Sequence, residues 1–86
     1  MNVEFSPHAE LRIKERDLSK SFVVEALFSA DKVESTRLNR SRFLAKKIYF
    51  NEKLNKEHLL IIVFEKQATF IRVVTIIDTS KIKKYY

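Results

Sequence analysis

Three residues near the start of the chain, His8, Arg12 and Arg16, combine side chains that suit phosphate chemistry. They are spaced four residues apart, so on an α-helix they fall within an arc of roughly 80°. Ser6 and Pro7 precede them and are typical of a helix start, because serine caps free N–H groups and proline lacks one. An imidazole that moves protons near neutral pH, beside two guanidiniums, favours a site that handles RNA. The alternative is a solvated basic face with an incidental histidine.

Further basic residues gather in two places. The first group lies within eleven residues that contain no acid, and its members are Arg37, Arg40, Arg42, Lys46 and Lys47. The second group ends the sequence, and its members are Lys81, Lys84 and Tyr85, with Lys83 and Tyr86 beside them. Basic side chains interleaved with aromatic ones suit a nucleic-acid strand, through phosphate neutralisation and base stacking. We therefore predict RNA contacts from both groups. The alternative for the first group is an edge strand whose Lys and Arg side chains resist aggregation.

Two polar residues stand in apolar segments. Arg72 interrupts a run of Val, Ile, Phe and Thr, and alternation places it on the same side as Phe70, Val74 and Ile76. An arginine on an apolar strand face needs a partner or an open cleft, so Arg72 is a further candidate for binding phosphate. His58 opens the most apolar segment of the chain. We predict that His58 lies at a solvent-exposed edge rather than in a catalytic site.

Composition limits what the chain can be. Its 86 residues suit one domain spanning 1–86, and a net charge of +6 favours polyanionic partners. The absence of cysteine and the presence of only two histidines predict no metal site, and the absence of glycine excludes the phosphate loops of nucleotide-binding folds. We therefore expect no cofactor. No apolar run reaches the roughly 18 residues that span a membrane, and no signal peptide is visible, so we expect a cytoplasmic protein without a membrane partner.

The hydrophobic pattern predicts helices first and strands afterwards. We expect helices over 7–16 and 20–29, and strands over 33–38, 42–50, 58–64 and 70–77. The continuous apolar run in 58–64 is typical of a central strand that is covered on both faces. This order indicates an α+β fold in which two N-terminal helices pack on a mostly antiparallel sheet of about four strands.

The second predicted helix is apolar on two sides. One face contains Val23, Ala26 and Leu27, while Val24 and Phe28 lie on another. A helix that is apolar on two sides is enclosed within the fold or touches a partner. We therefore expect a homodimer contact or a second protein against Val24 and Phe28.

The N-terminal pattern resembles that of a small domain family of unknown function. Its hallmark is a His-Ala…Arg…Glu-Arg helix, matched here by His8, Ala9, Arg12, Glu15 and Arg16. The closing run over 79–85 agrees in a suggestive way, and the middle of the chain agrees only in pattern. That family is similar to the BrnT and RelE/ParE-type toxins of toxin–antitoxin systems. The resemblance extends over nearly the whole chain.

The resemblance implies a RelE-like sheet and a metal-independent endoribonuclease of a type II toxin–antitoxin system. Such enzymes often act on ribosome-bound mRNA and are neutralised by a cognate antitoxin protein. In this interpretation His8 moves protons, and Arg12, Arg16 and Arg72 stabilise charge on the phosphate. The rival interpretation is a non-catalytic module that binds nucleic acid or protein, in which the same α-helical residues tie the helix to the sheet. Fold similarity does not decide between the two.

Overall fold

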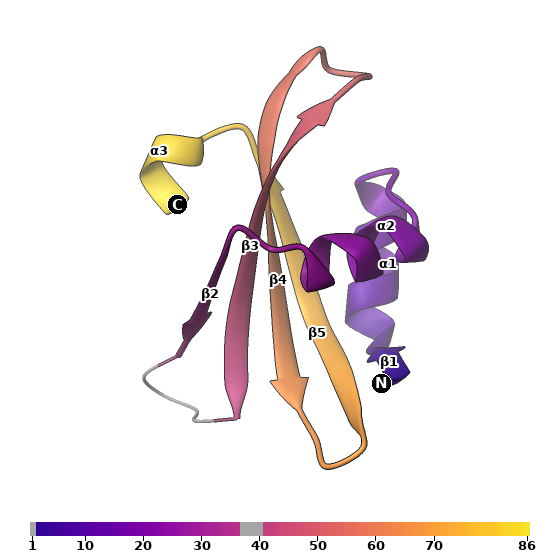
Figure 1. Ribbon diagram of the computed structural model, residues 1–86. Helices are drawn as coiled ribbons and strands as arrows, with labels where there is room; N and C mark the ends of the chain where they lie inside the picture. The colour runs from indigo at the N-terminus through magenta and orange to yellow at the C-terminus, as the bar shows by residue number, and fades with distance from the viewer. Residues whose placement is uncertain (1, 37–40) are drawn as a thin grey trace.

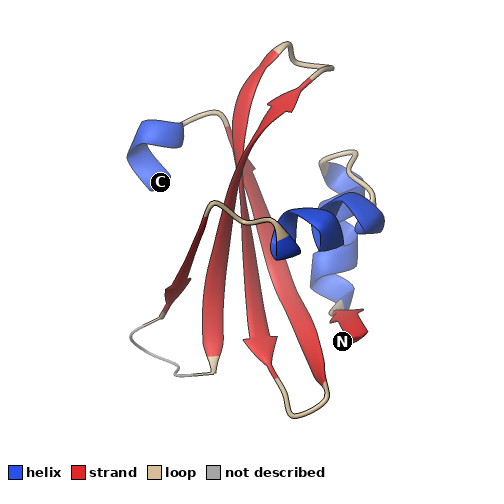
Figure 2. Ribbon diagram, in the orientation of Figure 1, coloured by secondary structure: helices blue, strands red, loops and turns tan. Residues whose placement is uncertain are grey.

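A computed structural model describes residues 2–36 and 41–86, which form one mixed sheet with helices on both of its faces (Figures 1 and 2). The elements in chain order are β1 (Asn2–Phe5), α1 (Pro7–Glu15), α2 (Lys20–Phe28), β2 (Lys32–Ser35), β3 (Arg42–Asn51), β4 (Lys56–Lys66), β5 (Phe70–Thr79) and α3 (Ile82–Tyr85). The strand order is β1-β5-β4-β3-β2, so the apolar strand β4 is central, as its sequence predicts.

The predicted fold class is wrong in two respects. The sheet has five strands rather than about four and is mixed, because β1 pairs in parallel with β5. A third helix, α3, lies on the face opposite α1 and α2 (Figure 1). The reason is physical: four residues carry little periodic signal, and β1 gains its hydrogen bonds from a strand almost 70 positions later. The hydroxyl of Ser6 donates to the carbonyl of Val74 over a sequence separation of 68 residues.

Local chemistry explains the bounds of α1 and α2. The Ser6 hydroxyl accepts from the Ala9 N–H (3.0 Å), and Ser19 caps α2 in the same way. At the end of α1, the N–H of Asp17 donates to Lys14 and the N–H of Leu18 donates to Ile13. Asp17 has a φ of 55°, the left-handed conformation that glycine normally supplies at such a helix end. Aspartate takes this place in a chain that has no glycine.

The core lies between the sheet and the pair α1 and α2. The helices contribute Ala9, Ile13, Val23, Ala26 and Leu27, and the facing strands contribute Ala45, Leu60, Ile62, Phe64, Ile71, Val73 and Ile76. Burying a side chain the size of leucine or isoleucine stabilises a fold by about 1.5–3 kcal/mol. This packing fixes which residues of each strand face the helices.

A β-bulge changes the alternation of β5. The register pairs Val73 with Phe64 and Thr75 with Val63, which leaves one extra residue in β5 at that point. Residues 71 and 73 therefore face the helices before the bulge, and residues 76 and 78 face them after it. The predicted common side for Arg72 and Ile76 is wrong, since Ile76 is fully buried under the helices whereas Arg72 is exposed on the opposite face.

Candidate active site

An open cleft of about 910 Å³ lies where the α1–α2 turn meets the β3–β4 hairpin and the end of β5. The α1–α2 side contributes Glu15, Arg16, Asp17, Leu18, Ser19 and Phe22. The strands contribute residues including Tyr49, Phe50, His58 and Asp78, and Ser80 follows the end of β5. An exposed ion pair between Lys53 and Asp17 joins the hairpin to the turn across this cleft. The cleft thus combines two cations, four acidic residues, aromatic rings and a histidine.

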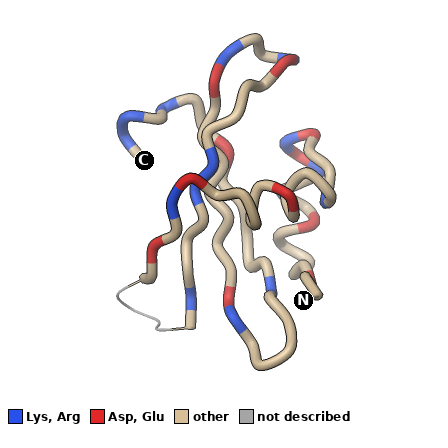
Figure 3. Tube along the Cα trace, viewed as in Figure 1, with Lys and Arg blue, Asp and Glu red and all other residues tan. Residues whose placement is uncertain are grey.

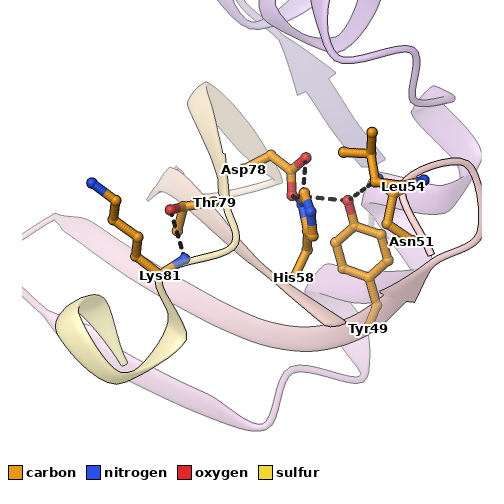
Figure 4. Close-up of polar contacts among 7 residues, drawn as sticks. All are labelled: Tyr49, Asn51, Leu54, His58, Asp78, Thr79 and Lys81. Carbon is orange, nitrogen blue, oxygen red and sulfur yellow. Dashed lines mark hydrogen bonds and ion pairs between the residues drawn. The ribbon is translucent and has the colours of Figure 1, made fainter. Parts of the chain in front are cut away.

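His58 and Asp78 form a buried pair at this cleft (Figure 4). The Nδ1 atom of His58 lies 3.2 Å from both carboxylate oxygens of Asp78, and the two side chains are only 7% and 6% exposed. The hydroxyl of Tyr49, the cross-strand neighbour of His58, donates to Asp78 (2.8 Å). Asp78 reaches this side of the sheet because the bulge in β5 shifts the alternation. Three strands therefore build the group.

Tyr49 acts as a neutral donor in this group. Burial is the main reason why the pKa of Tyr49 is raised to about 12, and the hydrogen bond to Asp78 contributes to the same rise. Asn51 donates to the Tyr49 oxygen over 3.4 Å, a long contact that acts in the opposite direction. Near neutral pH the phenol keeps its proton and donates to the Oδ1 atom of Asp78, which is one of the two oxygens that His58 also contacts.

The second ring nitrogen of His58, Nε2, is covered from solvent and has no hydrogen-bond partner. An unpaired buried nitrogen costs about 1–3 kcal/mol. With Nδ1 directed at Asp78, Nε2 is the nitrogen that remains to take up or release a proton. The predicted solvent-exposed position of His58 is wrong, since the residue is 6% exposed. Alternation along β4 gives no signal for this burial, because residues on both faces of the strand, Leu59 and Ile61 as well as Leu60 and Ile62, are buried.

The structure separates the four residues predicted to be catalytic. Arg16 caps the C-terminal end of α1 and lines the cleft that contains His58. His8 is exposed in the first turn of α1, two turns away from Arg16, and Arg12 contacts Glu15 (3.7 Å). Arg72 lies on the face of the sheet opposite the helices, so it joins none of the other three.

Acids from neighbouring strands accompany the described cations of the first predicted RNA-binding group. Arg42 bonds Glu65 (2.9 Å) and Lys46, which is buried, bonds Glu34 (2.7 Å). Lys47 lies 3.7 Å from Asp31. Arg37 and Arg40 lie outside the described residues. The 37–47 stretch contains no acidic residue of its own, but its described cations form ion pairs with acidic residues from other parts of the chain.

Arg72 belongs to a similar arrangement on the open face of the sheet. The register places it between Glu4 of β1 and Glu65 of β4, and Glu65 in turn stands opposite Arg42. Acidic and basic residues therefore alternate across four neighbouring strands. Opposite charges at cross-strand positions stabilise a sheet, which gives Arg72 a structural explanation without a bound phosphate.

The second predicted group keeps its charges uncompensated. Lys81, Lys83 and Lys84 follow Ser80, a residue of the cleft, and give the trace its basic C-terminal segment (Figure 3). None of them forms an ion pair within residues 2–36 and 41–86. The side chain of Lys81 extends away from the His58–Asp78 pair (Figure 4). Lys84 lies over the ring of Tyr85, with its Nζ 5.3 Å from the ring centroid. A basic and aromatic segment thus begins at the rim of the cleft.

Within the described part of the chain, no three His, Asp or Glu side chains come together as a metal site, and no helix is long and apolar enough to cross a membrane. Comparison with protein-family models, curated proteins and solved structures finds no match to this chain. The resemblance to the toxin families therefore stays a prediction.

Proposed function

We propose that this protein is a toxin-like endoribonuclease that cuts RNA without a metal ion, with its active site in the cleft around His58. The observation that carries the proposal is the His58–Asp78 pair, which leaves Nε2 unpartnered beside a cleft that also contains Arg16. A histidine oriented by a carboxylate transfers protons, and an arginine stabilises charge on phosphate. The basic tail supports a polyanionic substrate.

The proposed reaction is a transesterification. Nε2 of His58 takes the proton of a ribose 2′-OH, and the 2′-oxygen attacks the adjacent phosphorus. Arg16 stabilises the negative charge that builds up on the phosphate oxygens. The P–O5′ bond breaks, and the 5′-oxygen takes a proton from water or from a protonated side chain. The products are a 2′,3′-cyclic phosphate and a 5′-hydroxyl end.

Substrate access requires the walls of the cleft to move apart around His58, because its Nε2 atom is covered. The contact between Lys53 and Asp17 joins the two walls of the cleft, and both side chains are largely exposed. Exposed ion pairs contribute little to stability, so RNA phosphates can compete for Lys53. In this proposal, entry of the RNA backbone separates the hairpin from the α1–α2 turn.

The second candidate function is a non-catalytic RNA-binding module, and the covered Nε2 favours it. In that case the His58–Asp78–Tyr49 group would only brace the end of the sheet, and the tail with Arg16 would bind RNA. This alternative predicts salt-sensitive RNA binding without cleavage.

The chain has two histidines, which supply a matched pair of variants. We expect His58→Gln to lower the rate of RNA cleavage by at least about 100-fold, the usual contribution of general acid–base catalysis. His8→Gln should leave the rate within a few-fold of the wild type. The assay follows a labelled single-stranded RNA in EDTA and identifies the 2′,3′-cyclic phosphate. Thermal melts and RNA anisotropy show that each variant folds and binds.

The outcomes separate the candidates. Loss of cleavage in His8→Gln with full activity in His58→Gln moves the site to the exposed face of α1. Wild-type protein that binds RNA but never cleaves it identifies the binding module. A folded, RNA-binding and fully active His58→Gln variant refutes the proposed site.

A further inference from the structure

Within residues 2–36 and 41–86, no strand pairs with the outer edge of β2. β2 is the last strand in the order β1-β5-β4-β3-β2. The N–H of Thr36 donates to the carbonyl of Arg42, and this bond fixes which residues of β2 bond to β3. Because hydrogen-bonded positions alternate in an antiparallel pair, the backbone groups of Val33 and Ser35 point away from β3. An exposed row of this kind accepts another strand.

Apolar side chains accompany this edge. Val33 is 57% exposed, and it faces the same side of the sheet as its partner Ala45, which belongs to the core. Phe28, at the end of α2 and four residues before β2, is 60% exposed. Val24, one turn earlier in the helix, is half-buried. The α2 face that the sequence predicts to meet a partner and the side chain of Val33 thus lie on the same side of the sheet.

We infer that β2 pairs with β2 of a second copy of this chain, antiparallel and about a two-fold axis at Val33. In this register the two Val33 residues exchange both backbone hydrogen bonds. Lys32 of each copy then stands opposite Glu34 of the other, because these residues flank Val33 symmetrically. A two-fold axis at Glu34 would oppose two glutamates, and an axis at Lys32 would oppose two lysines. Charge complementarity therefore selects both the occupant and the register.

The pairing joins two five-stranded sheets into one continuous sheet. Within its own chain, Lys32 donates to a Tyr86 backbone oxygen (2.9 Å) and lies 3.7 Å from Glu34, and Glu34 is bonded by Lys46 (2.7 Å). The intermolecular pairs therefore extend an existing charge network rather than create a buried one. Two exposed phenylalanines and two exposed valines are brought to one side of the joint. Because β2 has only four residues, the dimer dissociates readily and its population depends on protein concentration.

Sedimentation velocity from low micromolar to millimolar protein tests this inference, with the whole chain in moderate salt. We expect a monomer–dimer equilibrium in the wild type. Lys32→Glu should weaken dimerisation by about tenfold, because both symmetric pairs change from attraction to repulsion. Lys56→Glu, the same charge change on an exposed lysine of β4, should leave the equilibrium unchanged.

Two further variants sharpen the test. A mixture of Lys32→Glu and Glu34→Lys chains should form mixed dimers, since each glutamate then meets a lysine. Val33→Pro removes an outward N–H while leaving the bonds to β3 intact, and it should weaken dimerisation. Circular dichroism confirms folding, and Val33→Pro decides the matter if Glu34→Lys fails to fold. A monomer at every concentration, or a dimer that folded Lys32→Glu and Val33→Pro variants form as well as the wild type, overturns the inference.

Discussion

The exposed face of α1 and the buried group around His58 both offer a histidine near an arginine, but they are built in different ways. His8, Arg12 and Arg16 come from one helix at regular spacing, and His8 is exposed. His58 and Asp78 come from neighbouring strands, are almost fully buried and orient one another. Regular spacing shows that residues share one face of a helix. Catalysis also requires neighbouring side chains that fix the orientation of a catalytic group and set its readiness to exchange protons. Long-range pairing supplies those neighbours.

The basic regions differ in a comparable way. The described cations of the 37–47 stretch meet acids from other strands, while the lysines of α3 and Arg16 form no ion pair within the described part of the chain. Local charge density in a sequence therefore overstates the charge that is available to a ligand. The cations that matter for RNA are those whose tertiary neighbours are neutral or distant.

The largest expected effect concerns the buried carboxylate. Asp78→Asn removes the charge that holds His58 and Tyr49, and we expect it to lower the free energy of unfolding by about 3 kcal/mol, as breaking a buried pair usually does. Asp31 forms an exposed pair with Lys47 and accepts from the Ile48 N–H. The matched change Asp31→Asn keeps an oxygen for that N–H and should cost less than about 1 kcal/mol. Urea denaturation measures both values. If both variants lowered the free energy of unfolding equally, the buried group around His58 would not be more strongly coupled than an exposed ion pair.

A smaller effect concerns the phenol of the same group. Tyr49→Phe deletes a hydrogen bond to Asp78 and should lower the free energy of unfolding by about 1 kcal/mol at neutral pH. The pKa of Tyr49 rises from 10.0 to about 12 on folding, so the unfolded chain loses this proton first as the pH rises. As the pH rises from 10 to 12, titration of Tyr49 therefore lowers the free energy of unfolding of the wild type. The Tyr49→Phe variant has no phenol at this position and does not lose stability in this way. The gap between wild type and variant should narrow over that range.

Thermal melts at several alkaline pH values follow this gap directly. The other titrating residues are common to both proteins, so the difference between their melting temperatures isolates Tyr49. A constant difference across the range would show that the phenol titrates alike in the folded and unfolded chains.

The smallest effect concerns single surface cations. Arg16→Gln should weaken RNA binding several-fold and lower the slope of log affinity against log salt by about one. Lys47→Gln should change the slope less, because Asp31 and the carbonyl of Ser29 already engage this lysine. Fluorescence anisotropy over a salt series gives both slopes. A larger change for Lys47→Gln would mean that RNA displaces its acidic neighbour.

Much of the fold follows from local sequence signals. Ser6 and Ser19 cap the helices as their positions predict, and the continuous apolar run places β4 at the centre of the sheet. The parallel strand β1 carries no such signal, because its pairing with β5 depends on contacts far along the chain. The helix α3 has only four residues, which is too short for a helical pattern to be recognised in the sequence.

The candidate site is harder to predict for the same reason. Arg16 lines the cleft, but the sequence gives no sign that His58, Asp78 and Tyr49 converge, since they are far apart in the chain. Pair formation across strands depends on register, and the register of β5 changes at a bulge that no residue pattern reveals. Burial then holds the side chains of His58 and Asp78 in one fixed arrangement.

The extra residue in β5 also has a genetic consequence. Deleting one codon between positions 74 and 77 would remove the bulge, restore plain alternation and keep Asp78 on the side of His58. Inserting one codon in the same window would shift the alternation by one residue and turn Asp78 to the other side of the sheet, away from His58. Single-codon deletions in this short window should therefore be tolerated better than single-codon insertions. Deep mutational libraries that include single-codon indels would display this as an asymmetry between the two kinds of change.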